Sequence, residues 1–401
     1  MKTIKNMGML KQVQHDVQSS IVNLKSSIII CLAVVIFTAC SEWTEIEPIH
    51  FGETDMNGTI RNDEYYAALR EWKSTPGLPQ TFVWFDNWSG ASPTGENSLR
   101  GLPDSVTIAS NWGGHPKFNL SPERKADMEY VQKVKGTKVV VTLFSEKVGA
   151  DMPWEDIYDI GNSYDEAVVR PAIRRYAEAI YDAVVETGYD GYDWDYEPTV
   201  SGCPSCEYYL WRNTVQRRIF VEELSYWFGA GATEPGRDRD GRKPAKPGLL
   251  FLIDGEVYSG SMGTDWLTYY VDYFVHQAYG ITTSYGLESR INGTIDRMNN
   301  WIKEGLITKE EIVRRCIVTE NFESYANTGG GILVHSKYVH KPTSGTHAGV
   351  DQQIGGFGIY RVGFDYNQGK GDYDGSPEWH FLRRGISNIY RIFNERRNAS
   401  E

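Results

Sequence analysis

The stretch "GYDGYDWDYEP", Gly188 to Pro198, alternates aromatic and acidic residues over the length of one β-strand. Alternate side chains of a strand share a face, so Asp193, Asp195 and Glu197 point one way and the aromatic residues between them point the other. Like charges at this spacing cannot all ionise cheaply in a low-dielectric interior, so we expect at least one proton to be retained near neutral pH. A retained proton is what a general acid requires, and the pattern therefore predicts a buried strand with acid chemistry on one face.

Short apolar runs recur along the rest of the chain, with helical stretches between them. The predicted strands span residues 81–86, 105–110, 137–144, 189–197, 248–254, 272–279, 316–320 and 355–361. Strands that alternate with helices in this number are typical of a closed (β/α)8 barrel, whose active-site residues lie at the C-terminal ends of the strands. We therefore predict an α/β protein with a (β/α)8 TIM barrel over residues 80–401, in which some helices are short or replaced by loops.

The clearest helical pattern, residues 171–188, leads directly into the acidic strand. Its apolar residues recur at spacings of three and four, and Gly188 offers a C-terminal cap. The helical patterns after the first and seventh strands are weak. Residues 323–353 are predicted to form a long functional loop rather than a packed element.

The N-terminal region is typical of a protein that is exported. Several lysines precede an apolar run at 28–37, which is too short to span a bilayer but suits a signal-peptide core. The run ends in "FTAC", which resembles a bacterial lipoprotein cleavage site with Cys40 as the lipidated first residue. We expect a signal peptide over 1–39, a tether and lead-in helix over 40–79, and a lipoprotein of the outer membrane, exposed on the cell envelope. A plain secretory signal and an uncleaved membrane anchor are the alternatives.

Composition and charge narrow the class of partner. Hydrophobic residues make up 40% of the chain and charged residues 23%, which is typical of a globular protein. The net charge of −12 lacks the basic surface that phosphate backbones require, so nucleic acid is excluded as a partner. Aromatic residues reach 13%, and exposed aromatic rings suit the apolar faces of sugars. We expect a monomer.

The cysteines and acids do not indicate a metal site. Cys203 and Cys206 could close a small disulfide after export, but no second Cys or His pair lies nearby to complete a zinc site. Cys316 begins an apolar run and is predicted to be a buried free thiol. Calcium loops use a flexible turn with glycine, whereas Pro198 follows a regular strand here. No metal and no cofactor are expected, although a purely structural network of the inward acids is an alternative to catalysis.

The segment "DGYDWDYE" is similar to the D-x-x-D-x-D-x-E signature of glycoside hydrolase family 18 and matches it at every fixed position. The family contains chitinases and endo-β-N-acetylglucosaminidases. The resemblance implies that Glu197 protonates the leaving glycosidic oxygen and that Asp195 orients and stabilises the substrate's own 2-acetamido group. That group attacks the anomeric carbon to give an oxazolinium intermediate. The resemblance also implies that Asp193 shares a proton with Asp195 and that Asp190 is structural.

The residues of the sixth predicted strand indicate which class of substrate is cleaved. In "VHQAYG", Gln277 and Tyr279 share one face and can both reach the centre of the barrel. Chitinases of the family usually carry Met-x-Tyr-Asp here, whereas endoglycosidases that cut N-glycans resemble Gln-x-Tyr. Gly280 stands where the Asp would be and is expected to leave room for a branched mannose core. The resemblance favours cleavage of the N,N′-diacetylchitobiose core of N-glycans or glycoproteins, with Gln277 and Tyr279 holding the acetamido group. A chitinase and a non-catalytic surface glycan-binding protein are the alternatives.

Aromatic and polar residues at other strand ends are candidates for a sugar platform. They are Trp84, Asp86 and Trp88 at the end of the first strand, Asn111 and Trp112 at the end of the second, and Tyr360 on the eighth. Single aromatic residues at such positions serve equally well to pack loops.

Overall fold

The computed structural model describes residues 62–112, 120–144, 159–197, 213–259, 266–368 and 378–400. The predictions for the signal peptide, for Cys40 and for the Cys203 and Cys206 disulfide lie outside these residues. Across the described ranges, no helix has both the length and the apolar character needed to cross a bilayer.

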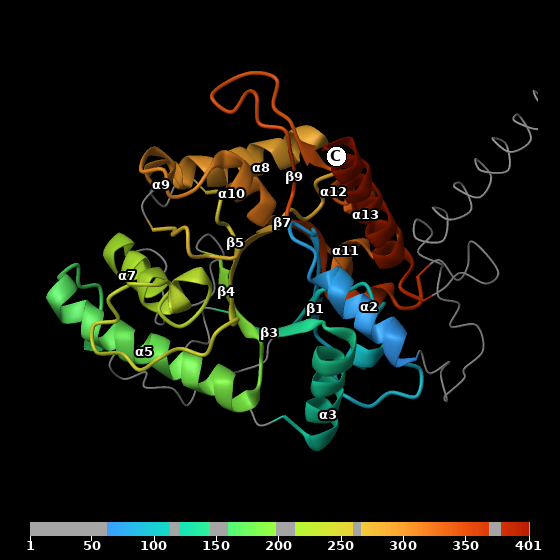
Figure 1. The fold of residues 1–401 in the computed structure, drawn as a ribbon, viewed down its shortest axis with the longest axis horizontal. Helices are drawn as coiled ribbons and strands as arrows, with labels where there is room; N and C mark the ends of the chain where they lie inside the picture. The colour runs from blue at the N-terminus through green and yellow to red at the C-terminus, as the bar shows by residue number, and fades with distance from the viewer. Residues whose placement is uncertain are drawn as a thin grey trace, which may run out of the picture. The chain divides into compact units, whose positions relative to one another are not determined.

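Eight parallel strands close into a barrel, so the predicted fold is confirmed (Figure 1). Around the barrel the order is β1, β10, β7, β6, β5, β4, β3 and β2. Each barrel strand therefore pairs with the next barrel strand along the chain, and β10 closes the barrel by pairing with β1. The strands are β1 Gln80–Phe85, β2 Ile108–Trp112, β3 Lys138–Phe144, β4 Gly191–Tyr196, β5 Leu250–Gly255, β6 Tyr273–Gln277, β7 Cys316–Asn321 and β10 Gly356–Tyr360.

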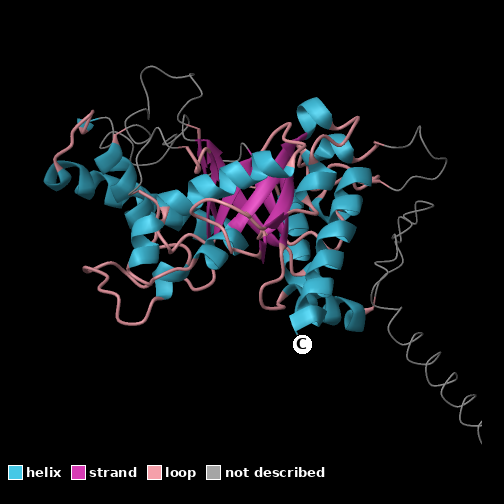
Figure 2. Cartoon of the chain, turned by 90° about the horizontal axis from the view of Figure 1, so that it is seen from above, coloured by secondary structure: helices cyan, strands magenta, loops and turns pink. Residues whose placement is uncertain are grey.

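Helices enclose the barrel on its outer side (Figure 2). They are α2 Asp63–Lys73, α3 Pro122–Tyr130, α5 Glu166–Thr187, α7 Thr214–Leu224, α8 Ser284–Arg297, α9 Asn299–Lys303, α10 Lys309–Arg315, α11 Phe322–Tyr325, α12 Ile332–His335 and α13 His380–Ser400. The first strand is followed by a single 3₁₀ turn at Leu99–Gly101, and the seventh by the short α11 and α12. Both connections are those whose helical patterns are weak in the sequence.

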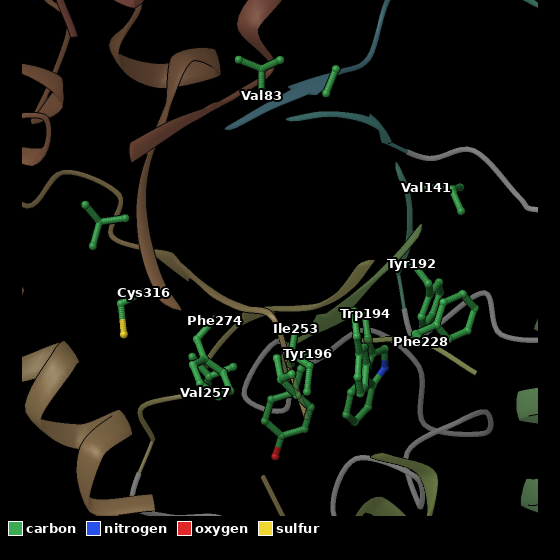
Figure 3. Close-up of a cluster of buried hydrophobic side chains, with 14 of the residues drawn as sticks. Val83, Val141, Tyr192, Trp194, Tyr196, Phe228, Ile253, Val257, Phe274 and Cys316 are labelled. Atoms are coloured by element: carbon green, nitrogen blue, oxygen red, sulfur yellow. The ribbon is translucent and has the colours of Figure 1, made fainter. Parts of the chain in front are cut away.

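The alternation of β4 separates two layers of side chains. Trp194 packs edge to face on Phe220 of α7 with ring centroids 5.1 Å apart, and Tyr196 packs on Trp266 at 4.5 Å. Figure 3 shows Tyr192, Trp194 and Tyr196 on the outer side of the strands. The interior of the barrel is filled by Phe82, Trp84, Ile108, Val140, Leu252, Val275 and Ile317. Asp193 and Asp195, which have the opposite parity to Trp194, therefore face this interior, as predicted.

Two elements begin three or more residues away from their predicted starts. Helix α5 begins at Glu166, because the side chain of Asp165 caps it by accepting from the Ala167 N–H, and Pro171 lies inside the helix rather than at its start. Strand β2 lies about three residues later than predicted, since its pairing with β1 sets Phe85 opposite Asn111. Asn111 and Trp112 are thereby part of the strand itself.

The prediction that 323–353 forms a long loop rather than a packed element is wrong. This segment contains α12 and a two-stranded hairpin formed by β8 Val339–His340 and β9 Gln352–Gln353. Buried side chains within it, among them Ile332 and Tyr338, pack it against the barrel. The apolar residues are too sparse to show a helical or strand period in the sequence, which is why the pattern is typical of a loop.

Candidate active site

The lower part of the site is a buried polar layer beneath the tip of β4. Asp193 is buried, and its Oδ2 accepts hydrogen bonds from Thr142 Oγ1 at 2.7 Å and from Trp84 Nε1 at 3.2 Å. Thr142 Oγ1 lies 2.5 Å from Ser110 Oγ, so the layer continues onto β2. Burial raises the pKa of Asp193 to about 6, while the two donors oppose that rise by favouring the ionised form.

A carboxyl group that sequence reasoning missed lies beside this layer. Asp254 on β5 is the register partner of Asp195 and is only 1% exposed. Its carboxyl group faces the same interior as those of Asp193 and Asp195, and its Oδ2 has no hydrogen-bond partner among the described residues. Burial, together with the charges of those two acids, raises the pKa of Asp254 well above its usual range. Its position as the last residue of the predicted fifth strand, with the inward parity of Leu252, is the signal that could have identified it.

The end of β6 joins the acids, as the spacing of its residues predicts. Gln277 Nε2 donates to Asp254 Oδ1 at 3.0 Å and lies 3.4 Å from Asp195 Oδ1. Burial raises the pKa of Tyr279 well above its usual range, and the charges of Asp254 and Asp195 add to the rise. The Tyr279 hydroxyl therefore keeps its proton and can act as a hydrogen-bond donor.

An aromatic cluster forms one side of the site around Tyr360. The Tyr360 ring stacks on Tyr279 with centroids 5.9 Å apart and planes 26° apart. Trp112 meets Tyr360 edge to face at 5.2 Å, and Trp84 does so at 6.0 Å. The candidates Tyr360, Trp112 and Trp84, from three different strands, are thus brought together with Tyr279.

The space next to Gly280 is not open, which corrects the expectation that it leaves room for a branched sugar. A Cβ atom at Gly280 would lie 2.8 Å from Tyr325 Oη, so the Tyr325 side chain from α11 occupies this position. Gly280 has φ +69°, and its N–H donates to Glu320 Oε1 at 2.8 Å. The glycine is therefore required by the left-handed turn that follows Tyr279. Tyr325, which is 37% exposed, is the second residue that sequence reasoning missed.

The remaining platform candidates have other contacts. Trp84 is 1% exposed and Trp88 is 2% exposed, so neither presents a ring face to a sugar in this structure. Trp88 Nε1 donates to Asp127 at 2.8 Å and packs the connection after β1. Asp86 accepts from Arg361 Nε at 2.7 Å, and Arg361 also binds Glu323. These ion pairs tie the ends of β1 and β10 to α11.

Two of the motif's acids lie at opposite ends of β4. Asp190 precedes the strand, and its Oδ2 accepts from the Val139 N–H at 2.9 Å and from Gln132 Nε2 at 2.8 Å. It thus ties β4 to β3 and to the helical turn Val131–Lys135 that follows α3, far from the mouth. Glu197 follows the strand at the C-terminal end of the barrel and is half-buried. Within the described ranges, no group of His, Cys, Asp and Glu side chains is arranged to hold a metal ion.

This arrangement can deliver a proton to a bound molecule and stabilise a positive charge beneath it. Glu197 is accessible at the mouth, while Asp193, Asp195 and Asp254 form a buried group in which protonation of one acid favours ionisation of the next. Gln277 and Tyr279 add an amide and a hydroxyl donor on the facing strand. Such a set suits acid-assisted cleavage of a polar bond.

Comparison with known proteins gives one family. The family described as "Glycoside hydrolase family 18, BT1044-like" has a sequence model that matches residues 44–375 of this chain. A solved structure of BT1044, in a selenomethionine form with a glutamate-to-glutamine substitution, is 25% identical with a TM-score of 0.56, covering 82% of this chain and 93% of that one. A family 18 chitinase from Pseudoalteromonas aurantia is 12% identical with a TM-score of 0.42, over 76% and 97% of the two chains. A chitinase from Bacteroides thetaiotaomicron is 13% identical with a TM-score of 0.40, over 78% and 97%. None of the curated proteins compared with the chain matches it.

Proposed function

Because the chain belongs to glycoside hydrolase family 18, we propose that it is an endo-β-N-acetylglucosaminidase that cleaves the N,N′-diacetylchitobiose core of N-glycans. The observation that carries this proposal is the pair formed by Gln277 and Tyr279. Gln277 donates to Asp254 and lies within reach of Asp195, and Tyr279 stacks on Tyr360 beside it. An amide and a hydroxyl in these positions suit an N-acetyl group held over the acids.

The proposed reaction proceeds with retention through the substrate's own acetamido group. Glu197 donates its proton to the glycosidic oxygen as the bond to the anomeric carbon breaks. The acetamido oxygen attacks that carbon, and Asp195, as an anion, accepts a hydrogen bond from the acetamido N–H and stabilises the oxazolinium ion. Water then attacks the same carbon, and Glu197 takes up its proton, which restores the acid for the next cycle.

The buried layer supports this division of roles among the acids. Thr142 and Trp84 both donate to Asp193, which favours its ionised form. Two adjacent anions in a buried site are unfavourable, so Asp195 binds a proton in the resting enzyme and releases it towards the buried layer when the cationic intermediate forms. The buried hydroxyl of Tyr279 can donate to the acetamido oxygen, since its raised pKa keeps the proton in place.

Tyr325 sets the shape of the site on the β6 side. Its hydroxyl fills the position beside Gly280 where chitinases of the family place a carboxylate. A phenol in place of a carboxylate removes a negative charge next to the scissile sugar and provides an exposed ring edge for contact with the apolar face of a sugar. This favours the endoglycosidase over the chitinase alternative.

We also propose that the enzyme is a monomeric lipoprotein of the outer membrane, with Cys40 as its anchor and its barrel exposed on the cell envelope. The lysines, the apolar run at 28–37 and the small residues before Cys40 support this. N-glycans on glycoproteins outside the cell would then be the accessible substrates.

A digest with an inactive control tests the proposed activity. An N-glycoprotein treated with the enzyme should retain one N-acetylglucosamine on each modified Asn, and the released glycan should carry the other at its reducing end. Glu197→Gln should give neither product. Cleavage of chitin oligosaccharides without cleavage of glycoproteins would identify a chitinase, and tight glycan binding without any cleavage would identify a binding protein.

A further inference from the structure

A carboxyl group on β5 belongs to the same buried cluster as the acids of β4. We propose that Asp254 is a positioning residue of the hydrolase, which in its protonated form donates a hydrogen bond to Asp193 or Asp195 while its other oxygen orients Gln277. This inference rests on the proposed function and places a second retained proton, besides that of Asp195, on a strand outside the acidic motif.

Two buried carboxyl oxygens lack a donor at this place in the part of the chain that the structure describes. Asp193 Oδ1 and Asp254 Oδ2 are both buried, and neither has an N–H or O–H donor among the described residues. The two carboxyl groups face the same interior from neighbouring strands, and each influences the pKa of the other. Two ionised carboxylates can only accept, so a hydrogen bond between them needs one of the two to be neutral. A proton held by one of the two acids and donated to the other would satisfy both buried oxygens.

The neighbours of each acid decide where that proton resides. Asp193 accepts from a hydroxyl and from an indole N–H, and both bonds favour its anion. Asp254 Oδ1 accepts from the Gln277 amide, and the carboxyl group faces the negative charges of the β4 acids. The titratable groups around it are Tyr192, Asp193, Asp195, Glu197 and Tyr279. None of these groups is a cation, so the environment favours the neutral form of Asp254.

A neutral Asp254 would allow the acids above it to work at neutral pH. Asp195 can pass its proton to Asp193 and ionise beneath the oxazolinium ion, because Asp254 supplies a donor rather than a third charge. If Asp254 lost its proton, the additional negative charge would draw the proton of Glu197 into the buried cluster. Deprotonation of Asp254 should therefore contribute to the alkaline limb of the pH profile, together with that of Glu197.

Two substitutions separate this role from simple packing. Asp254→Asn keeps the size and a donor but cannot ionise, so we expect it to lower kcat by less than about tenfold. With one titrating group fewer, the first loss of a proton falls to Glu197, and the alkaline limb of kcat/KM should move upward by about 0.5–1 pH unit. Asp254→Ala removes both the proposed donor and the acceptor that holds the Gln277 amide at 3.0 Å, and we expect it to lower kcat by about ten- to a hundredfold.

The kinetic profiles should be measured on whichever substrate is cleaved, a chitobiose-core glycan or a chitin oligosaccharide, so that the test does not depend on the substrate branch. Melting curves of both variants check that they fold. An infrared difference spectrum of the wild type minus Asp254→Asn at pH 7, recorded without substrate, should show the carbonyl stretch of a buried carboxylic acid.

This spectrum shows whether Asp254 carries a proton, even if the chain proves to be a binding protein. Absence of the carboxylic acid band would overturn the proposal. An Asn variant whose alkaline limb coincides with that of the wild type, or one that loses as much turnover as the Ala variant, would do the same.

Discussion

Replacing Thr142 by valine removes one buried hydroxyl and should move the acidic limb of the pH–rate profile upward. The Thr142 hydroxyl donates to Asp193 Oδ2 at 2.7 Å, and valine has nearly the same shape without the donor. A hydrogen bond to a charged group is worth about 1.5–3 kcal/mol, which corresponds to about 1–2 pKa units. The pKa of Asp193, about 6 in the wild type, should rise by that amount, and the buried acids should ionise at correspondingly higher pH.

The same substitution should have a pH-dependent effect on stability. Because the pKa of Asp193 is raised from 3.8 to about 6 on folding, the native state holds its proton longer, and stability falls as the pH rises through this range. In Thr142→Val the fall should continue to higher pH. The free energy of unfolding should therefore differ from the wild type by about 1.5–3 kcal/mol at alkaline pH and by less at pH 4, where Asp193 is largely protonated in the native state.

The assay is kcat/KM as a function of pH for the wild type, Thr142→Val and Thr142→Ser, with denaturant unfolding of each at acid and alkaline pH. Thr142→Ser keeps the hydroxyl and should reproduce the wild-type acidic limb. If the Val variant also reproduces it, Asp193 does not govern ionisation of the buried acids and the reasoning fails.

Three further substitutions test other parts of the account. Glu197→Gln should lower turnover by about 10²–10⁴-fold with an unchanged melting curve, and a folded variant that keeps more than about a tenth of wild-type turnover would exclude Glu197 as the acid. Tyr279→Phe should lower kcat more than it raises KM if its hydroxyl steadies the oxazolinium ion, and a change in KM alone would assign it to ground-state binding. Cys40→Ala should release the protein from membranes into the soluble fraction, and retention after a carbonate wash would indicate an uncleaved N-terminal anchor.

The barrel could be predicted because its strands are short apolar runs with clear alternation. β4 is the strongest case, since Trp194 and Asp195 have chemically opposite side chains and can only face opposite sides. The pairing of Gln277 with the acids followed from the same periodicity. The start of α5 could not be placed, because Pro171 is common at a first helical position and the Asp165 cap lies before the apolar pattern begins.

The parts of the site that could not be predicted depend on contacts between distant segments. Asp254 is one acid at the end of an apolar strand, and only the register with Asp195 shows that it joins the cluster. Tyr325 lies in a segment without periodicity, and its place over Gly280 follows from the turn that Glu320 holds. The position of Trp84 in its strand predicts that it faces the barrel interior. Whether it forms a sugar platform or donates to Asp193 depends on the positions of β3 and β4, which the sequence does not give.

Mass spectrometry of a side-by-side digest tests the central claim most directly. An N-glycoprotein and chitotetraose are each incubated with equal amounts of the wild type or of Glu197→Gln, and the masses of the products are measured. The account predicts a single N-acetylglucosamine left on each modified Asn by the wild type alone, with chitotetraose cut slowly or not at all. Efficient cleavage of chitotetraose by the wild type, with the glycoprotein unchanged, would contradict it.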